Sequence, residues 1–109
     1  MSDVTIEKLM SRMPKAFIAE KAEGIDAVIQ YHLSGEEAGD WIIKIQDGTC
    51  EIEPGVADNP RMTLSADSED YKNVILGKLN GMNAFMEGKL KLAGDLNLAM
   101  KLTSFFKLN

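Results

Sequence analysis

The sequence predicts one α+β domain: a five-stranded, mainly antiparallel sheet covered on one face by helices and enclosing an apolar cavity. Apolar residues recur at helical spacing near the N-terminus, alternate between residues 25 and 66, and return to helical spacing with one more alternating segment at 89–93. At 109 residues the chain can build one hydrophobic core but has no room for a separate cofactor domain. We therefore treat 1–109 as a single domain.

A helix is expected first, because apolar residues follow one another at intervals of three and four. These residues are Ile6, Leu9, Met10, Met13 and Phe17. Asp3 is the predicted N-cap, since its carboxylate can accept from the first free backbone N–H groups. Pro14 cannot donate a backbone hydrogen bond, so we expect it to kink or end this helix or to begin a second short one running toward Gly24.

Four strands are predicted next from alternation with a period of two. The residues expected to face the core are Ile25, Ala27, Ile29, Tyr31 and Leu33, then Trp41, Ile43 and Ile45, then Cys50 and Ile52, then Met62 and Leu64. The dipeptide Asp47-Gly48 suits a type I′ turn, so the strands on either side of it should be antiparallel neighbours. Pro54-Gly55 predicts a second turn.

Helices should follow the fourth strand. Asp67 or Ser68 is the predicted N-cap of a helix whose apolar face is expected to meet the sheet through Tyr71, Val74, Ile75 and Leu79. Asn80 can cap a short helix that Gly88 closes in a left-handed conformation. The fifth strand is predicted at 89–93, and a final helix from about 95 to 106.

Charge and composition exclude several functional classes. The net charge of −5 repels nucleic-acid phosphates, so no nucleic-acid partner is expected. No apolar run approaches the roughly 20 residues needed to span a bilayer, and the N-terminus lacks the pattern of a secretory signal. The single cysteine, Cys50, suits a reducing compartment, and we expect a cytoplasmic protein.

Charge is unevenly distributed along the chain. Residues 1–71 hold 6 basic and 15 acidic side chains (net −9), whereas residues 72–109 hold 6 basic and 2 acidic ones (net +4). The basic residues of interest in the second segment are Lys89, Lys91, Lys101 and Lys107. They either solvate the exposed sides of helices or form a transient contact with anionic lipid head groups.

The sequence offers little for catalysis or for binding a metal. His32 and Cys50 are the only residues of their types, and alternation places them on opposite faces of the sheet. We interpret them as a surface histidine and a structural thiol, and we expect no enzyme activity, no metal and no cofactor. The acidic pairs 36–37 and 69–70 are explained by loop solvation and by the positive end of a helix.

An apolar cavity is the alternative to a catalytic cleft. The fifth strand lies between two apolar helices and is bracketed by Gly88 and Gly94, which allow sharp reversals. The chain holds seven methionines, whose flexible side chains either fill an ordinary core or repack around variable apolar guests. The predicted ligand-binding residues are Met82, Phe85, Met86, Leu90, Leu92, Leu98, Leu102 and Phe105. Arg12, Gln30 and His32 are the polar candidates near its mouth.

The same region carries a family resemblance. Gly77-Lys78-Leu79, Ala84-Phe85, the segment 88–92 (GKLKL), Gly94-Asp95 and 98–102 (LAMKL) resemble the sterol carrier protein 2 family, in its small stand-alone bacterial or archaeal form. One departure is Gly81, where the family commonly has proline. The resemblance implies a sheet-and-helix shell around a tunnel that holds a fatty acid, an acyl-CoA or a sterol-like lipid.

Two functions from different classes therefore follow. The first is an intracellular carrier that binds a hydrophobic small molecule and transfers it between membranes or to enzymes. The second is a non-catalytic interaction module, including a homodimer, in which the apolar C-terminal helices meet a partner chain. Co-purifying lipid favours the first, and a ligand-free dimer favours the second.

Overall fold

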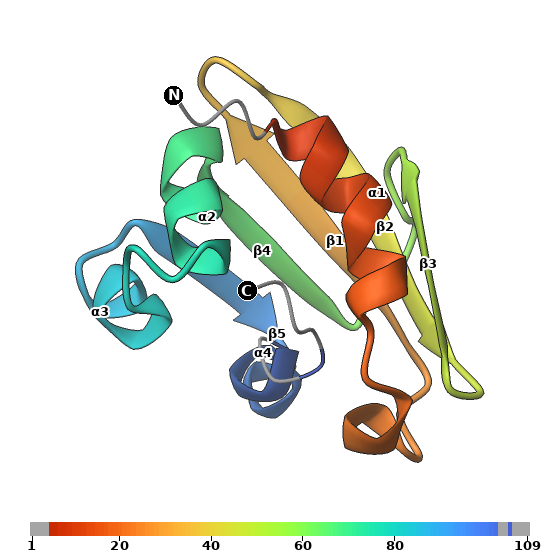
Figure 1. Ribbon diagram of the computed structural model, residues 1–109. Coiled ribbons are helices and arrows are strands. Elements are labelled where there is room, and N and C mark those ends of the chain that lie inside the picture. Colours follow the sequence, from red (N-terminus) through yellow and green to blue (C-terminus); the bar gives the residue numbers. More distant parts are fainter. Residues whose placement is uncertain (1–4, 103–104, 106–109) are drawn as a thin grey trace.

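The computed structural model describes residues 5–102 and 105 (Figure 1). Within these residues the chain forms an α+β domain in the predicted order of elements. The elements are α1 (Ile6–Ala16), the 3-10 helix η1 (Ala19–Ala22), β1 (Ala27–Ser34), β2 (Gly39–Gln46), β3 (Thr49–Pro54), β4 (Met62–Asp67), α2 (Ser68–Ile75), α3 (Gly81–Met86), β5 (Leu90–Gly94) and α4 (Leu96–Leu102).

The five strands form one sheet in the order β3-β2-β1-β4-β5. Three of the four pairings are antiparallel, and only β1 and β4 run parallel, with Tyr31 opposite Leu64. Helices α1, α2 and α4 lie across the same face of the sheet (Figure 1). This face, called the inner face below, carries Ile29 and Tyr31 of β1 and Ile43 of β2. The predicted mainly antiparallel sheet covered on one face is confirmed.

The first helix differs from the prediction at both ends. Thr5, not Asp3, is the N-cap, and its hydroxyl accepts from the N–H of Lys8 at 3.1 Å. Asp3 itself lies outside the described residues. Pro14 sits inside the last turn and does not end the helix, which continues to Ala16. A proline removes one backbone hydrogen bond, and the buried apolar face of α1, which reaches Met13 next to Pro14, holds the helix against the sheet.

The turns follow local chemistry closely. Asp47 and Gly48 both have positive φ angles, 52° and 75°, as the predicted type I′ turn between β2 and β3 requires. Gly94 ends β5 with φ 91°, and a Cβ at this position would lie 2.4 Å from the carbonyl oxygen of Arg61. The end of β5 therefore lies so close to the backbone before β4 that only glycine fits at this position.

Three of the later elements begin at side-chain caps, of which those of α2 and α3 are as predicted. Asp67 accepts from the N–H of Glu69 at the start of α2, and Asn80 accepts from the N–H of Asn83 at the start of α3. Asp95 accepts from the N–H of Leu98 in the same way at the start of α4. These bonds hold helices of eight, six and seven residues, lengths that are marginal without caps and packing.

The final helix is described over part of its predicted range. Helix α4 is described from Leu96 to Leu102, and residues 103, 104 and 106 of the predicted range lie outside the described residues. Phe105 is fully buried in the core. Its backbone carbonyl accepts from the N–H of Ile18 at 2.7 Å, which brings this part of the chain to the segment between α1 and η1.

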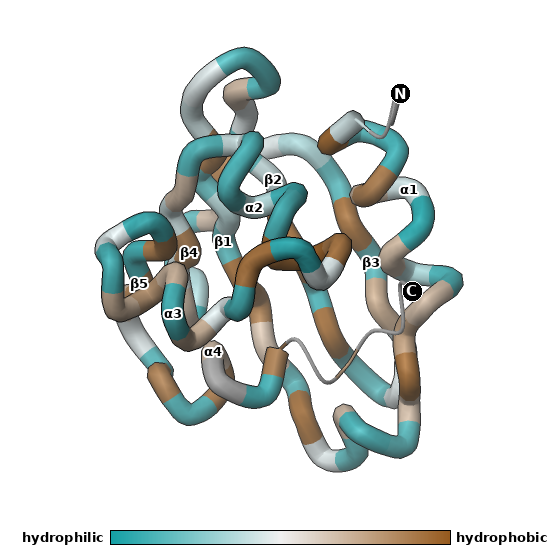
Figure 2. The backbone as a smooth tube through the Cα atoms, turned by 60° about the vertical axis from the view of Figure 1, so that its left-hand side comes forward, coloured by the Kyte–Doolittle hydropathy of each residue, from teal (hydrophilic) through white to brown (hydrophobic). Residues whose placement is uncertain are grey.

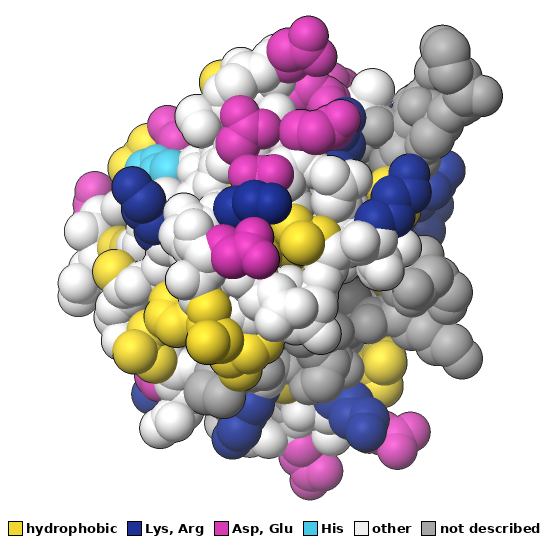
Figure 3. Space-filling view, turned by 90° about the vertical axis from the view of Figure 1, so that its left-hand side faces the viewer, with side chains coloured by type: hydrophobic (Ala, Val, Ile, Leu, Met, Phe, Trp, Pro, Cys, Tyr) yellow, Lys and Arg dark blue, Asp and Glu magenta, His cyan; other side chains and the backbone are white. Residues whose placement is uncertain are grey.

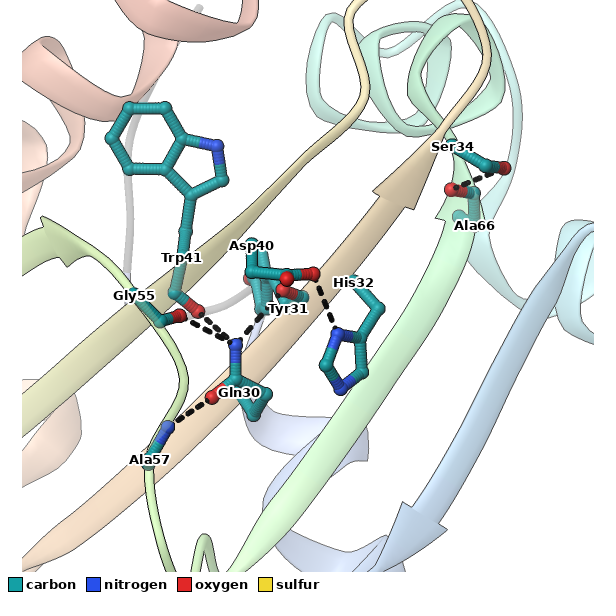
Figure 4. A network of polar contacts seen from close by, with 9 residues as sticks. All are labelled: Gln30, Tyr31, His32, Ser34, Asp40, Trp41, Gly55, Ala57 and Ala66. Carbon is teal, nitrogen blue, oxygen red and sulfur yellow. Dashed lines mark hydrogen bonds and ion pairs between the residues drawn. The ribbon is translucent and has the colours of Figure 1, made fainter.

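Gln30, a predicted polar candidate near a cavity mouth, is instead buried on the outer face of the sheet and does not line the apolar pocket (Figure 4). Its side-chain amide N–H groups donate to the carbonyls of Tyr31, Trp41 and Gly55 at 3.0–3.2 Å. Its side-chain oxygen accepts from the N–H of Ala57 at 2.6 Å. Because every polar atom of the amide is satisfied, Gln30 holds the loop after β3 against the sheet and has a structural role.

Candidate ligand-binding pocket

An apolar pocket lies on the inner face, between the sheet and the C-terminal helices. Its volume is about 840 Å³. The described residues that line it from the strands and from α1 are Met13, Tyr31, Leu64, Leu90 and Leu92. Those from α2 and the segment after it are Tyr71, Val74, Ile75, Gly77, Leu79 and Asn80. Those from α3 and α4 are Gly81, Met82, Phe85, Leu96, Ala99 and Leu102.

The pocket exists because short helices cover this part of the sheet. Helix α3 spans six residues and buries only Ala84 among them, whereas the eleven-residue α1 buries Ile6, Leu9, Met10 and Met13. Figure 2 shows α2, α3 and α4 standing in front of the sheet as separate short segments. Each is fixed by its own cap, so they frame a space without filling it.

The rim of the pocket is unusually apolar for a surface. Met82 is 51% exposed, Phe85 41% and Leu96 49%, and all three line the pocket. Met86, next to them on α3, is 77% exposed. Figure 3 shows the α3 side of the molecule, where hydrophobic side chains gather in a patch. We call Met82, Phe85, Met86 and Leu96 the apolar rim. Contiguous apolar surface of this kind marks ligand or interaction sites.

The wall of the pocket toward the middle of the sheet carries two phenols. Tyr31 of β1 and Tyr71 of α2 are 1% and 2% exposed, and their rings meet edge to face with centroids 5.1 Å apart. The Tyr71 hydroxyl donates to the sulfur of Met13 at 3.5 Å. Burial raises the pKa of both phenols above their ordinary value, and the hydrogen bond between them offsets this only in part for Tyr31.

The structure brings five of the eight predicted ligand-binding residues together in the lining. These are Met82, Phe85, Leu90, Leu92 and Leu102. The other three do not line the pocket: Met86 points to solvent, and Leu98 and Phe105 are buried in the core. Helix α4 presents Ala99 rather than Leu98 to the space. Ligand contact stays a prediction for all eight.

Sequence reasoning missed the contribution of α1, β1 and α2 to the lining. The spacing of Met13, Tyr31, Tyr71 and Val74 predicts an inward face, and the structure places all four in the pocket lining. Leu79 was assigned to the face of α2, but it follows that helix and lines the pocket from the loop. Periodicity identifies which residues face inward, but it does not distinguish a filled interior from a hollow one.

The candidate catalytic residues lie apart from the pocket. His32 is exposed on the outer face and its Nδ1 lies 2.7 Å from the carboxylate of Asp40 (Figure 4). Cys50 is buried on the inner face, opposite Ile45, and burial raises the pKa of its thiol to about 11. A thiol held protonated is a poor nucleophile. The opposite placement of the two residues is as predicted.

Other polar clusters are explained by local structure. Glu37 accepts from the N–H of Ile6 at 2.8 Å and pairs with Lys72, so the predicted loop carboxylate joins α1 to α2. Over the described ranges, no group of three or more His, Cys, Asp or Glu side chains is arranged to hold a metal. Arg12 is exposed on α1 and does not line the pocket.

The lysines of the basic C-terminal segment are described only in part. Lys89 and Lys91 border a second, more open groove with His32 and Asp67 on the outer face. Lys101 is exposed on α4, and Lys107 lies outside the described residues. None of the helices in the described part of the chain is long and apolar enough to cross a bilayer.

The geometry places this chain in the class of α+β domains that enclose an apolar pocket between a mixed sheet and short helices. The chain belongs to the SCP-2 sterol transfer family, whose profile matches residues 6–107. The predicted family is therefore confirmed.

Curated relatives and solved structures agree with this assignment. The chain is 36% identical over 84 residues to hydroxysteroid dehydrogenase-like protein 2 of Xenopus tropicalis, covering 76% of this chain and 20% of that protein. It is 31% identical over 99 residues to sterol carrier protein 2 of Rattus norvegicus, covering 91% and 18%. It thus spans about a fifth of the length of these relatives. The solution structure of palmitated SCP2L2 from Aedes aegypti superposes with a TM-score of 0.73 at 25% identity, covering 93% of each chain.

Proposed function

We propose that this chain binds a lipid in the apolar pocket and acts as a carrier rather than as an enzyme. The observation that carries the proposal is the pocket itself, about 840 Å³ and lined mainly by aliphatic and aromatic side chains. Ligand sites in proteins typically enclose about 300–1,000 Å³ with such a lining. The palmitated mosquito relative supports a long-chain ligand.

Burial of apolar surface alone can supply the affinity. Each methylene transferred from water contributes about 0.8 kcal/mol, so a 16-carbon chain offers up to roughly 12 kcal/mol before costs. Association and ordering consume several kcal/mol of this amount, which leaves micromolar binding within reach. Over most of the pocket, the ligand is therefore selected by how well its shape fits the apolar walls.

A pair of phenylalanine variants on α4 tests pocket binding. Ala99 lines the pocket, whereas Asn97, two residues earlier, is exposed. Ala99→Phe fills part of the space, and overpacking costs only about 1–3 kcal/mol, so the fold should survive. We expect displacement of a fluorescent fatty acid to weaken at least tenfold in Ala99→Phe and to stay at the wild-type value in Asn97→Phe. Equal binding by both folded variants would place the ligand elsewhere.

The apolar rim supports two further roles. As a membrane contact, it would let a lipid pass between the bilayer and the pocket beneath Met82 and Phe85, with lysines of the basic C-terminal segment meeting anionic head groups. As a protein contact, it would serve the alternative function, an interaction or dimerisation module.

Native mass spectrometry distinguishes the carrier from the interaction module: a monomer with bound lipid supports the carrier, and a ligand-free dimer supports the module. A lone buried thiol, Cys50, fits a cytoplasmic setting for either role.

A further inference from the structure

The two phenols make one wall of the pocket chemically different from the rest. Tyr31 and Tyr71 come from β1 and α2, and with Met13 of α1 they line the pocket toward the middle of the sheet, whereas α3, which carries most of the apolar rim, lies against the edge strand β5. Most of the remaining described lining is aliphatic or aromatic. A lipid that enters past the rim therefore meets hydroxyl groups only after its leading end has crossed an apolar space.

The two phenols have few hydrogen-bond partners apart from each other: Tyr31 and Tyr71 share one hydrogen bond, and the further contact of the Tyr71 hydroxyl is with a sulfur. This hydroxyl donates to the thioether sulfur of Met13 at 3.5 Å, and sulfur is a poor acceptor compared with oxygen. Burial keeps both phenols protonated, so both remain neutral donors through neutral and mildly alkaline pH. Two hydroxyls that share one hydrogen bond still carry a second O–H between them, so a ligand oxygen that reaches this wall would offer a better acceptor than the sulfur, and the flexible Met13 side chain can move aside.

The charge of the lining limits which oxygen fits. Along the described lining there is no Lys, Arg or His, and the polar side chains are Tyr31, Tyr71 and Asn80. The oxygen of Asn80 already accepts from the N–H of Asn83. A carboxylate pushed to the phenol wall would be buried without a cation, which costs far more than burying a neutral oxygen that receives a hydrogen bond.

We propose that Tyr31 and Tyr71 form a recognition site for the uncharged oxygen of a lipid, such as the hydroxyl or carbonyl of a long-chain alcohol, aldehyde or ester. The proposal rests on the proposed function, because it assumes that a lipid occupies the pocket. It adds that the ligand enters oxygen first, and that the phenol wall disfavours an ionised carboxylate. A fatty acid in the same pocket would keep its carboxylate at the rim.

Three ligands of equal chain length test the proposal: 1-dodecanol, dodecanoate and dodecane, each displacing an apolar fluorescent reporter at about pH 8. We expect the alcohol to bind the wild-type protein at least tenfold more tightly than the carboxylate. In Tyr71→Phe the alcohol should lose roughly 3- to 10-fold in affinity while dodecane is unaffected, because one hydrogen bond is removed. Tyr31→Phe should show a loss in the same direction, which protects the test if one variant folds poorly.

The matched control is Thr63→Val, which removes a hydroxyl from the outer face of β4, opposite Gln30. It should leave all three affinities unchanged. If the three ligands bind wild type but neither tyrosine variant alters the preference for the alcohol, the recognition site is refuted and the lipid pocket stands. If dodecanoate binds as tightly as the alcohol, the recognition site is also refuted. If none of the three displaces the reporter, the proposed function itself fails.

Discussion

The inner face of the sheet is close-packed where α1 covers it and hollow where α2, α3 and α4 cover it. Under α1, strands β1 and β2 bury Ile29, Ile43 and Ile45 completely, and Leu9 of α1 is 1% exposed. Under α2, α3 and α4, strands β4 and β5 line a pocket of about 840 Å³. Both sides carry the same alternating apolar pattern. The difference lies in the covering helices, since one long helix fills its area and three short ones do not.

The two sides are joined by a small number of polar contacts. Glu37, in the loop between β1 and β2, accepts from the first N–H of α1 and pairs with Lys72 of α2. Asp67, Asn80 and Asp95 cap the short helices. We infer that caps and the Glu37 contact hold the hollow side open, whereas apolar packing holds the other side closed.

Truncation of one strand residue on each side should give the largest contrast. Ile43→Ala removes a fully buried side chain from the close-packed side, and we expect the free energy of unfolding to fall by about 2–5 kcal/mol. Leu92→Ala enlarges a space that already exists, so we expect a loss below about 1.5 kcal/mol. Urea unfolding of the two variants measures both values. Equal losses would mean that the pocket side is packed as tightly as the other.

The Glu37 contact should appear as a pH dependence of stability. Hydrogen bonds from Lys72 and from the Ile6 N–H lower the pKa of this carboxyl below its ordinary value. A lowered folded-state pKa stabilises the native state above the unfolded pKa of about 4.3, and this stability is lost as pH falls through the folded value. We expect Glu37→Gln to lower the free energy of unfolding by about 1 kcal/mol at neutral pH.

The gap between wild type and Glu37→Gln should shrink as the pH falls below about 4. Chemical unfolding in a pH series checks this. The neighbouring Glu36 is exposed, so Glu36→Gln serves as the control and should change stability by less than about 0.5 kcal/mol. A gap that persisted unchanged into acid would show that the carboxylate charge does not join the two helices.

The smallest effect on stability is expected at the apolar rim. Met86 is 77% exposed, so Met86→Ser should shift the free energy of unfolding by no more than about 0.5 kcal/mol. If the rim meets membranes, lipid transfer to vesicles should nevertheless slow several-fold. Val56 is 64% exposed in the loop after β3, and Val56→Ser is the control that should transfer lipid at the wild-type rate.

Vesicle composition separates the rim from the lysines. Faster transfer to anionic than to neutral vesicles, weakened by salt, would assign a role to the basic C-terminal segment. If the transfer rate depends on Met86 but not on vesicle charge, apolar insertion alone accounts for the membrane contact. If the transfer rate depends on neither, this surface has no role at the membrane.

Local chemistry made much of the fold predictable. Asp47 and Gly48 adopt the positive φ angles that their turn needs, and Asn80 caps α3 as its side chain allows. The placement of His32 and Cys50 on opposite faces follows from a strand period of two, which any extended backbone obeys. Such features depend on a few neighbouring residues, so the sequence determines them without reference to the rest of the molecule.

Other features depend on residues that are distant in sequence. The sequence suggests Gln30 as a polar residue near a cavity mouth, yet the loop at Gly55 and Ala57 folds over it and satisfies its amide. Pro14 reads as the end of a helix, yet packing against the sheet carries α1 two residues further. In each case a tertiary contact outweighs the local preference, and its partner cannot be identified from the neighbouring sequence.

The sequence by itself determined the family, the order of elements and the inward faces, because periodicity and capping are written in short segments. The tertiary structure alone decided where that inward surface is hollow. It turned Ala99 rather than Leu98 toward the space and brought Tyr31 and Tyr71 together across 40 residues of chain. A cavity is a property of how far apart covering helices stand, and that distance is set by caps and contacts from several elements at once.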